Sequence, residues 1–292
     1  MKIQQITILG TGLMGGSLGL ALKKSGFAGR VVGCDKEEVL AQAKKMRAID
    51  AGIADPVQAA AGSDVVVLAA PVGQIMDLVE RIGPRLGPQA LLTDVGSTKA
   101  EIVARARAVF GAEAPRRFLG GHPMAGKEHS GIEHAEAELF QDAAWIFTPQ
   151  PRQKLQKGAG GEFVKLVKSV GAKPVLLDAE RHDRLCAWVS HLPQMLSTAL
   201  AAAIEEEFGH DAELQAVSGR ALKDMTRLAA SPYAMWRDIA LTNSSNIEAG
   251  LLKLEQKLAH VRENLRTAEL REEFERAREF KDATESQRHR GK

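Results

Sequence analysis

The sequence predicts an α/β domain with a doubly wound, mostly parallel sheet, followed by an all-helical domain. Three observations lead to this prediction. Strand and helix patterns alternate through the first part of the chain, a glycine-rich segment separates the first strand from the first helix, and strand patterns cease from residue 179 onward. Such alternation indicates parallel strands covered by helices on both faces. We therefore expect one domain at residues 1–178 and a second at residues 179–292.

The expected strands are short apolar runs, and the helices between them carry periodic apolar residues. The run at 65–69 is apolar throughout, which is typical of a central parallel strand. A stretch rich in glycine and polar residues, 150–161, is expected to be a loop. In chain order we expect strands at 6–9, 30–34, 65–69, 91–94 and 174–177, and helices at 13–25, 39–48 and 162–170.

In the second part of the chain, helical patterns continue to about residue 280. Near its end, Leu251, Leu254, Leu258, Val261 and Leu265 are spaced 3, 4, 3 and 4 residues apart. That spacing is typical of a coiled-coil seam. The seam would pack either within its own subunit or across a two-fold axis. We expect the second arrangement, a homodimer formed through the C-terminal helices.

Composition narrows the class of protein. The formal net charge is +2, and no basic stretch is interleaved with aromatic residues, so nucleic-acid binding has no electrostatic support. No apolar run reaches membrane-spanning length, and the N-terminus leads directly into a strand pattern instead of a signal peptide. Cys34 and Cys186 are too few and too far apart for a metal cluster or a disulfide framework. We expect a cytoplasmic protein without a metal.

Residues 10–15 read Gly-Thr-Gly-Leu-Met-Gly, a G-x-G-x-x-G motif between a strand and a helix. This context makes the motif indicative of dinucleotide binding in a Rossmann-type domain. Gly10 permits a tight turn, Gly12 lets the backbone approach a pyrophosphate, and Gly15 lets the helix pack closely on the strand. Leu13 and Met14 open the helix, whose N-terminal N–H groups and partial positive charge suit phosphates.

Asp35 lies 20 residues after Gly15, at the end of the second expected strand. A carboxylate there accepts hydrogen bonds from ribose hydroxyls and repels a 2′-phosphate, so NAD is favoured over NADP. Lys36, the next residue, would soften that repulsion. Ala70 and Pro71 follow the central strand. Either these small residues let the cofactor lie close to the backbone, or they form a simple strand-to-helix turn.

Two segments in the first domain carry candidate catalytic side chains. Ser97 follows the strand at 91–94, and ligands of open α/β sheets bind outside such strand ends. Its hydroxyl would cap the next helix, make a catalytic hydrogen bond, or do both. His122 lies in Gly-Gly-His-Pro-Met-Ala-Gly at 120–126. A loop rich in glycine and proline holds an imidazole rigidly and leaves one side open, which favours a general base.

The helical half contributes three further polar segments. They are Ser-His-Leu-Pro-Gln at 190–194, Asp-Met-Thr-Arg at 224–227 and Met-Trp-Arg-Asp at 235–238. Together with the glycine motif, the segment Asp-Val-Gly-Ser at 94–97 and the His122 segment, they resemble the prephenate/arogenate dehydrogenase family, in the same order. The resemblance covers roughly residues 1 to 265. It implies a Rossmann-type domain, a helical domain that forms the dimer, and NAD-dependent oxidative decarboxylation of a cyclohexadienol in tyrosine synthesis.

The resemblance also implies roles for individual residues. His122 matches the catalytic histidine that contacts the ring hydroxyl, and Ser97 matches its hydrogen-bonding partner near the nicotinamide. Arg227 matches the arginine that receives a substrate carboxylate. His191 matches a second active-site histidine that lines or gates the pocket.

Three more positions bear on the substrate. Glu128 and Trp236 match family positions near the site. Gln194 stands where many prephenate-using relatives have a histidine, so this chain departs from their pattern. We expect prephenate as the substrate, with arogenate, or the use of both, as the alternative.

Two other classes of protein compete with this assignment. A β-hydroxyacid dehydrogenase has a similar two-domain plan but usually relies on a lysine in its helical domain. A non-catalytic, NAD-sensing dimer would keep the glycine motif and the leucine seam but would leave His122, His191 and Arg227 without a role. Turnover of a cyclohexadienol distinguishes both from the expected enzyme.

Overall fold

The computed structural model describes residues 2–127, 129–151, 153–155 and 157–290. Contacts between residues separate the chain into two compact units, 1–244 and 245–292, and each is described by itself.

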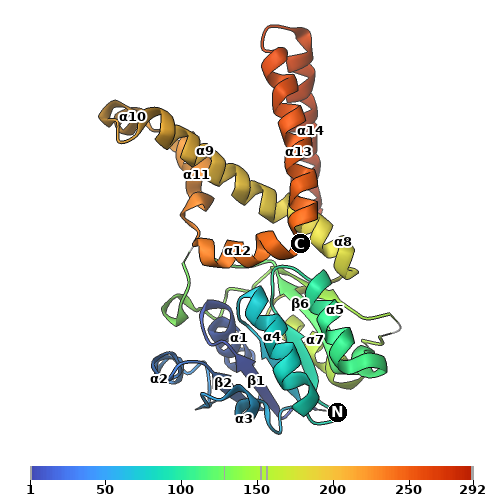
Figure 1. Ribbon diagram of the computed structural model, residues 1–292. Coiled ribbons are helices and arrows are strands. Elements are labelled where there is room, and N and C mark those ends of the chain that lie inside the picture. The colour runs from blue at the N-terminus through green and yellow to red at the C-terminus, as the bar shows by residue number, and fades with distance from the viewer. Residues whose placement is uncertain (1, 128, 152, 156, 291–292) are drawn as a thin grey trace. The chain divides into compact units, whose positions relative to one another are not determined.

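An eight-stranded sheet forms the centre of the first unit (Figure 1). Its spatial order is β3-β2-β1-β4-β5-β6-β7-β8, and every neighbouring pair is parallel except β6 and β7. The expected strands are all present, with ends that differ by at most one residue. The strands are β1 Gln5–Leu9, β2 Arg30–Cys34, β3 Ala51–Gly52, β4 Val65–Leu68, β5 Leu91–Asp94, β6 Phe118–Pro123, β7 Ala144–Thr148 and β8 Lys173–Leu176.

Helices cover both faces of this sheet, because side chains alternate between the faces along each strand. In β4, Val65 and Val67 join the core beneath α1, α2 and α7, whereas Val66 and Leu68 join the core beneath α3, α4 and α5. The expected loop at 150–161 is partly wrong, since α7 already begins at Gly158. The helices are α1 Leu13–Lys24, α2 Glu37–Lys45, α3 Pro56–Ala60, α4 Val72–Ile82, α5 Ala100–Phe110, α6 Ala114–Arg117 and α7 Gly158–Ser169.

The chain order creates a switch point beside β1. From β1 the chain moves outward to β2 and β3, then returns to β4 on the other side of β1. The loops after β1 and β4 therefore diverge to opposite faces, and a crevice opens at the carboxyl ends of these two strands. Ligands of open α/β sheets bind at such a point.

Beyond β8, the described part of the chain contains helices only. They are α8 Ala179–Cys186, the π-helical turn η4 Ala187–His191, α9 Leu192–Phe208, α10 Ala212–Val217, α11 Arg220–Thr226, the 3-10 turn η5 Arg227–Ala230 and α12 Tyr233–Thr242. Pro193 lacks an N–H and cannot continue the α-helical ladder from α8. The Leu192 N–H donates to the carbonyl of Ala187 five residues earlier, so His191 lies in a widened turn.

Two carboxylates attach these helices to the carboxyl edge of the sheet. Asp183 of α8 accepts hydrogen bonds from the backbone N–H groups of Lys99 and Ala100, at the start of α5. Asp238 of α12 accepts one from the Gly73 N–H, in the first turn of α4. Helix N-termini carry unpaired N–H groups and a partial positive charge, so a carboxylate from a distant segment caps them well. The two helices are thereby fixed beside the switch point.

The second unit holds α14 Ala268–Arg290 and nearly all of α13 Ser244–Glu263. Lys257 of α13 pairs with Glu273 of α14, so the two helices lie side by side. Of the leucine seam, Leu258 and Leu265 are 57% and 62% exposed within a single chain. No helix among the described residues is long and apolar enough to cross a membrane.

Candidate active site

The glycine motif forms the turn between β1 and α1, and its three glycines differ in their surroundings. Gly10 has a φ of +96°, and a Cβ there would lie 2.2 Å from the Ala69 carbonyl oxygen. A Cβ on Gly15 would lie 1.9 Å from the Gly10 carbonyl oxygen, whereas one on Gly12 would meet nothing within 4 Å. Gly10 and Gly15 are therefore required by packing, and Gly12 faces open space.

A cavity of about 400 Å³ lies at this switch point. Asp35 lies at its rim, half-buried, as predicted. Its Oδ2 accepts a 2.7 Å hydrogen bond from the Thr11 N–H, and its Oδ1 accepts a 2.8 Å bond from the Lys36 N–H. Oδ2 also accepts a longer, 3.4 Å bond from the Thr11 hydroxyl, so Oδ1 is the oxygen with a second acceptor position for a ribose hydroxyl. The cavity is lined by Leu9, Gly10, Gly12, Cys34, Asp35, Ala54, Pro56, Ala69, Ala70, Pro71, Gln74 and Leu78.

The first turn of α1 suits an anion. It contains no acidic residue, and no side chain caps its N-terminus. Leu13 and Met14, its first residues, are half-buried. The open space at Gly12, the uncapped N–H groups and the Asp35 carboxylate fit the pyrophosphate and ribose of a dinucleotide. Ala70 and Pro71 line the cavity and lead into α4, so the strand-to-helix turn is confirmed and their contact with a cofactor stays a prediction.

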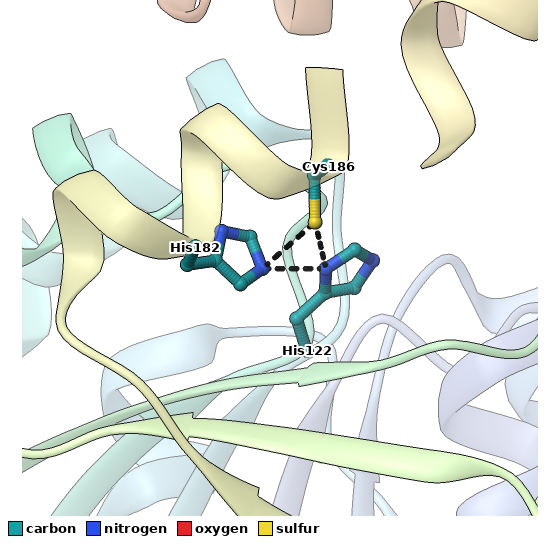
Figure 2. Close-up of side chains that lie close together, drawn as sticks. All are labelled: His122, His182 and Cys186. Carbon is teal, nitrogen blue, oxygen red and sulfur yellow. Dashed lines mark hydrogen bonds between the residues drawn. The ribbon is translucent and has the colours of Figure 1, made fainter. Parts of the chain in front are cut away.

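The loop predicted around His122 is wrong, because this segment pairs with β7 as the end of strand β6. His122 therefore lies at the carboxyl end of β6, at the same edge of the sheet as the cavity. The ring is buried, and its Nδ1 lies 2.8 Å from Nε2 of His182 on α8 (Figure 2). His182 Nδ1 lies 2.8 Å from Oδ1 of Asp183. Cys186, one turn further along α8, places its Sγ 3.4 Å from His182 Nε2. The predicted base thus belongs to a buried cluster from β6 and α8.

The surroundings keep these histidines neutral. Burial, followed by the nearby charges of His182 and Lys99, holds the pKa of His122 well below its usual value. Burial likewise lowers the pKa of His182, although the hydrogen bond to Asp183 opposes this. Burial lowers the pKa of His191 to about 4 and raises that of the Cys186 thiol to about 12. At neutral pH, His122 is therefore an uncharged imidazole able to accept a proton.

Ser97 lies between β5 and α5 and is half-buried. Its predicted alternative role as a helix cap is wrong, because α5 begins at Ala100 and Asp183 caps that helix from α8. Among the described residues no hydrogen bond joins Ser97 to His122, whose Nδ1 is occupied by His182. A buried ion pair between Lys99 and Asp94 anchors the same segment.

The substrate-binding candidates of the helical half gather around α9. The His191 ring meets the Trp236 ring edge-on, with centroids 6.0 Å apart. Gln194, one turn after His191, donates from Nε2 to the Leu228 carbonyl oxygen at 2.8 Å and so ties α9 to η5. Arg227, exposed, begins η5.

Glu128 lies outside the described residues.

Three buried polar atoms near these candidates have no partner in the described structure. They are His191 Nε2, Trp236 Nε1 and Gln194 Oε1. Asn243 Nδ2 donates toward His191 Nδ1 at 3.1 Å, so a neutral His191 carries its proton on Nε2. His191 and Trp236 therefore each offer a buried donor, and Gln194 offers a buried acceptor. Buried polar atoms of this kind pair with water or with a polar ligand.

Three residues of the cluster, His182, Asp183 and Cys186, were not predicted from the sequence as site residues. His182 and Asp183 lie in Glu-Arg-His-Asp at 180–183, a run of charged residues that is typical of an exposed helix surface. One signal was available: His182 and Cys186 are four residues apart and so share a helix face. Nothing in the sequence shows that this face turns toward His122.

Taken together, the switch-point cavity, the glycine turn and the buried neutral histidine define a dinucleotide-dependent oxidoreductase. Two family models match the chain. One, described as the nucleotide-binding domain of prephenate dehydrogenase, matches residues 18–176, and the other, described as its dimerization domain, matches residues 178–280. The chain belongs to the prephenate dehydrogenase family, an NAD-dependent oxidoreductase family. The resemblance noted from the sequence motifs is confirmed.

Sequence identity to prephenate dehydrogenases of two bacteria supports this assignment. The chain is 32% identical over 262 residues to the prephenate dehydrogenase of Lactococcus lactis, covering 89% of this chain and 70% of the relative. It is 35% identical over 248 residues to that of Bacillus subtilis, covering 83% of this chain and 65% of the relative. The chain thus spans about two thirds of the length of these relatives.

Solved structures resemble the whole fold. Prephenate dehydrogenase from Aquifex aeolicus, in complex with hydroxyphenyl propionate and NAD+, superposes with a TM-score of 0.84 at 29% identity, covering 100% of this chain and 99% of that one. Arogenate dehydrogenase from Synechocystis superposes with a TM-score of 0.78 at 26% identity, covering 96% and 99%. The predicted fold class is confirmed, and the NAD+ of the first structure agrees with the predicted cofactor.

Proposed function

We propose that this chain catalyses the oxidative decarboxylation of prephenate, with transfer of a hydride to NAD, as a step in tyrosine synthesis. The observation that carries the proposal is the buried, neutral His122 at the sheet edge that also holds the dinucleotide cavity. Prephenate carries a hydroxyl at ring carbon C4 and a carboxylate at C1. A hydride leaves C4, the hydroxyl proton leaves oxygen, and CO₂ leaves C1 with its bonding electrons retained by the ring.

His122 accepts the hydroxyl proton as the hydride departs, and returns it to the phenolate oxygen that forms when CO₂ leaves. A positioned general base contributes roughly 10²–10⁴-fold to a rate. NAD supplies the hydride acceptor when it is bound in the cavity at Gly12 and Asp35. Ser97, in the segment after β5, lies beside the reacting ring and the nicotinamide. Because loss of CO₂ makes the ring aromatic, the protein needs only to orient the reactants and to hold the proton.

Arg227 receives a carboxylate of the substrate. Its guanidinium presents two parallel donors, which match a carboxylate in a way that lysine cannot reproduce. The hydrogen bond from Gln194 to the Leu228 carbonyl fixes the turn on which Arg227 lies. Glu128 remains a candidate substrate contact by its position in the motif.

The unpartnered atoms at α9 and α12 bear on the choice of substrate. His191 Nε2 and Trp236 Nε1 are donors, and they suit the keto acid side chain of prephenate, which offers only acceptors. Arogenate is the second candidate, because the buried acceptor Oε1 of Gln194 suits an amino group. Two donors against one acceptor favour prephenate.

We further propose a cytoplasmic homodimer with a domain boundary near residue 178, where the two matched family regions meet. Both cysteines are free, in keeping with a reducing compartment. The exposed seam leucines of α13 would be buried between two chains. Leu258→Asp is expected to give the mass of one chain in light scattering, while Gln256→Asp, at an exposed position beside the seam, keeps the mass of two. A dimeric Leu258→Asp variant would exclude this interface.

The test of the catalytic assignment is His122→Asn. We expect this variant to bind NAD and substrate normally and to lose about 10²–10⁴-fold in kcat. His134→Asn, at a half-exposed histidine, serves as the control and should keep full activity. Near-normal turnover by His122→Asn would remove His122 as the base.

Arg227→Ala tests the substrate contact. Hydrogen bonds to a charged group contribute about 1.5–3 kcal/mol, so KM for the substrate should rise roughly 10- to 100-fold. Arg220→Ala, on the neighbouring helix α11, is the control. An unchanged KM in Arg227→Ala would place this arginine outside the binding site.

A further inference from the structure

A chain of hydrogen-bonding groups runs from a carboxylate on α8 to the ring of His122. Asp183 Oδ1 lies 2.8 Å from His182 Nδ1, and His182 Nε2 lies 2.8 Å from His122 Nδ1. All three side chains are buried, and Figure 2 shows the two imidazole rings meeting through these nitrogens. Only His122 has a part in the reaction proposed above.

The carboxylate determines where each proton lies. Asp183 also accepts hydrogen bonds from the backbone N–H groups at the start of α5, as an ionised carboxylate does. Since a carboxylate only accepts, His182 Nδ1 must donate to it. A neutral His182 then has a lone pair on Nε2, and the hydrogen bond to His122 requires a proton on His122 Nδ1. In a neutral His122 the unprotonated nitrogen is therefore Nε2.

Cys186 completes the cluster without changing this assignment. Its Sγ lies 3.4 Å from His182 Nε2 and 3.9 Å from His122 Nδ1. The same three residues have a donor set that could hold a metal ion. However, two nitrogens bound to one tetrahedral zinc lie about 3.3 Å apart, given Zn–N bonds of about 2.0–2.1 Å. The observed 2.8 Å between the ring nitrogens is a hydrogen-bond distance.

We propose that His182 and Asp183 are positioning residues that hold His122 in the tautomer whose free Nε2 takes the substrate's hydroxyl proton. This inference rests on the proposed function, since it concerns the same base. When Nε2 gains the proton, His122 carries protons on both nitrogens, and its Nδ1–H still donates to His182. The Asp183 carboxylate, two hydrogen bonds away, stabilises the new positive charge without a second proton transfer.

A comparable arrangement is known from serine proteases, where a carboxylate fixes the tautomer of the catalytic histidine. There, an asparagine in place of the carboxylate leaves the geometry intact and lowers kcat about 10⁴-fold. In this chain an imidazole is inserted between the carboxylate and the base. We therefore expect a smaller effect on loss of His182, of about 10²-fold or more.

Two substitutions of His182 separate positioning from packing. His182→Gln keeps an acceptor oxygen near the lost Nε2 and should hold kcat within about tenfold of the wild-type value. His182→Leu fills similar space without an acceptor, so kcat should fall about 10²-fold or more while KM for NAD and substrate changes little. Equal kcat values for these two variants would overturn the inference.

A second readout does not depend on turnover. With ¹⁵N-labelled histidine, the His122 signals are assigned by their loss in His122→Asn. The proton should lie on Nδ1 in the wild-type protein and in His182→Gln, and should move to Nε2 in His182→Leu. A wild-type His122 protonated on Nε2 would overturn the inference even if every His182 variant failed to fold.

The remaining outcomes show whether the positioning role of His182 and Asp183 is wrong or the proposed function itself is wrong. If His122→Asn is inactive but His182→Leu turns over normally, the positioning role is wrong and the proposed function stands. If His122→Asn is active, His122 is not the base, and the positioning role of His182 and Asp183 is refuted with it. The proposed function itself is refuted only if the wild-type protein does not turn over prephenate. Stoichiometric zinc in the purified protein that disappears in Cys186→Ala would show a metal site in place of the hydrogen-bonded chain.

Discussion

The three glycines of the turn after β1 make a matched experiment, because packing requires Gly15 and leaves Gly12 free. A Cβ on Gly15 would lie 1.9 Å from the Gly10 carbonyl oxygen and 2.7 Å from the Ile8 side chain. Gly15→Ala must therefore push α1 away from β1. A Cβ on Gly12 meets nothing within 4 Å, and its φ of −72° is open to any residue, although its ψ of −149° lies about 30° beyond the β region. Gly12→Ala should fold with only a small adjustment of the backbone.

The magnitudes follow from these contacts. Overpacking costs about 1–3 kcal/mol and a displaced backbone more, while alanine gains about 1 kcal/mol over glycine in helix propensity. Gly15→Ala should lose about 1–3 kcal/mol net, or roughly 2–12 °C in Tm at 2–4 °C per kcal/mol. For Gly12→Ala, the weaker helix cap and the reduced entropy of the unfolded chain roughly offset each other, so stability should change by less than about 1 kcal/mol.

NAD binding should be weakened more by Gly12→Ala than by Gly15→Ala, which is the reverse of their effects on stability. The space beside Gly12 is where the pyrophosphate approaches the backbone, so a methyl group there should weaken NAD binding at least tenfold, or about 1.4 kcal/mol. Thermal unfolding without ligand and calorimetric titration with NAD measure the two effects separately. Normal NAD affinity in Gly12→Ala, or an unchanged Tm in Gly15→Ala, would refute this division of roles.

Three further predictions concern charge. Lys99→Met leaves the Asp94 carboxylate buried without its cation and should cost about 3–5 kcal/mol in chemical unfolding; a loss below 1 kcal/mol would contradict a buried pair. Asp35→Ser removes the repulsion of a 2′-phosphate and should shift the ratio of kcat/KM for NAD over NADP at least tenfold toward NADP, and an unchanged ratio would exclude Asp35 from the ribose site. The pKa of His191, about 4 when folded, lies below its unfolded value of about 6.5, so the unfolded chain binds this proton first as pH falls. The free energy of unfolding should therefore keep its full value above pH 6.5 and fall by up to about 3 kcal/mol toward pH 4. The fall should be smaller in His191→Gln. An equal dependence of stability on pH in the two proteins would contradict this role of His191.

Five of the eight strands and the cofactor turn could be predicted from the sequence because they depend on local patterns. The strands β3, β6 and β7 were missed, since β3 has only two residues and the Gly-Gly-His-Pro segment of β6 is typical of a loop. Apolar runs such as Val65–Leu68 mark central strands, and a glycine motif between a strand and a helix has one common structural meaning. Asp35 was found by its distance along the chain from the same motif.

The interior of the active site could not be predicted in the same way, because its contacts join distant segments. Asp183 caps α5 although 83 residues separate it from Ala100, and this long-range bond replaces the local cap expected from Ser97. The partner of His122 comes from α8, 60 residues further along the chain. Periodicity identifies which face of a helix is apolar, but it does not show which polar side chain on that helix will be buried against a strand.

The most direct test of the central claim is NADH formation by the purified protein with NAD and prephenate, with released CO₂ measured in parallel and arogenate compared at equal concentration. We expect one NADH and one CO₂ for each prephenate consumed, at a higher kcat/KM than with arogenate. Absence of turnover on both substrates, with NAD binding intact, would contradict it and would identify a non-catalytic, NAD-binding protein.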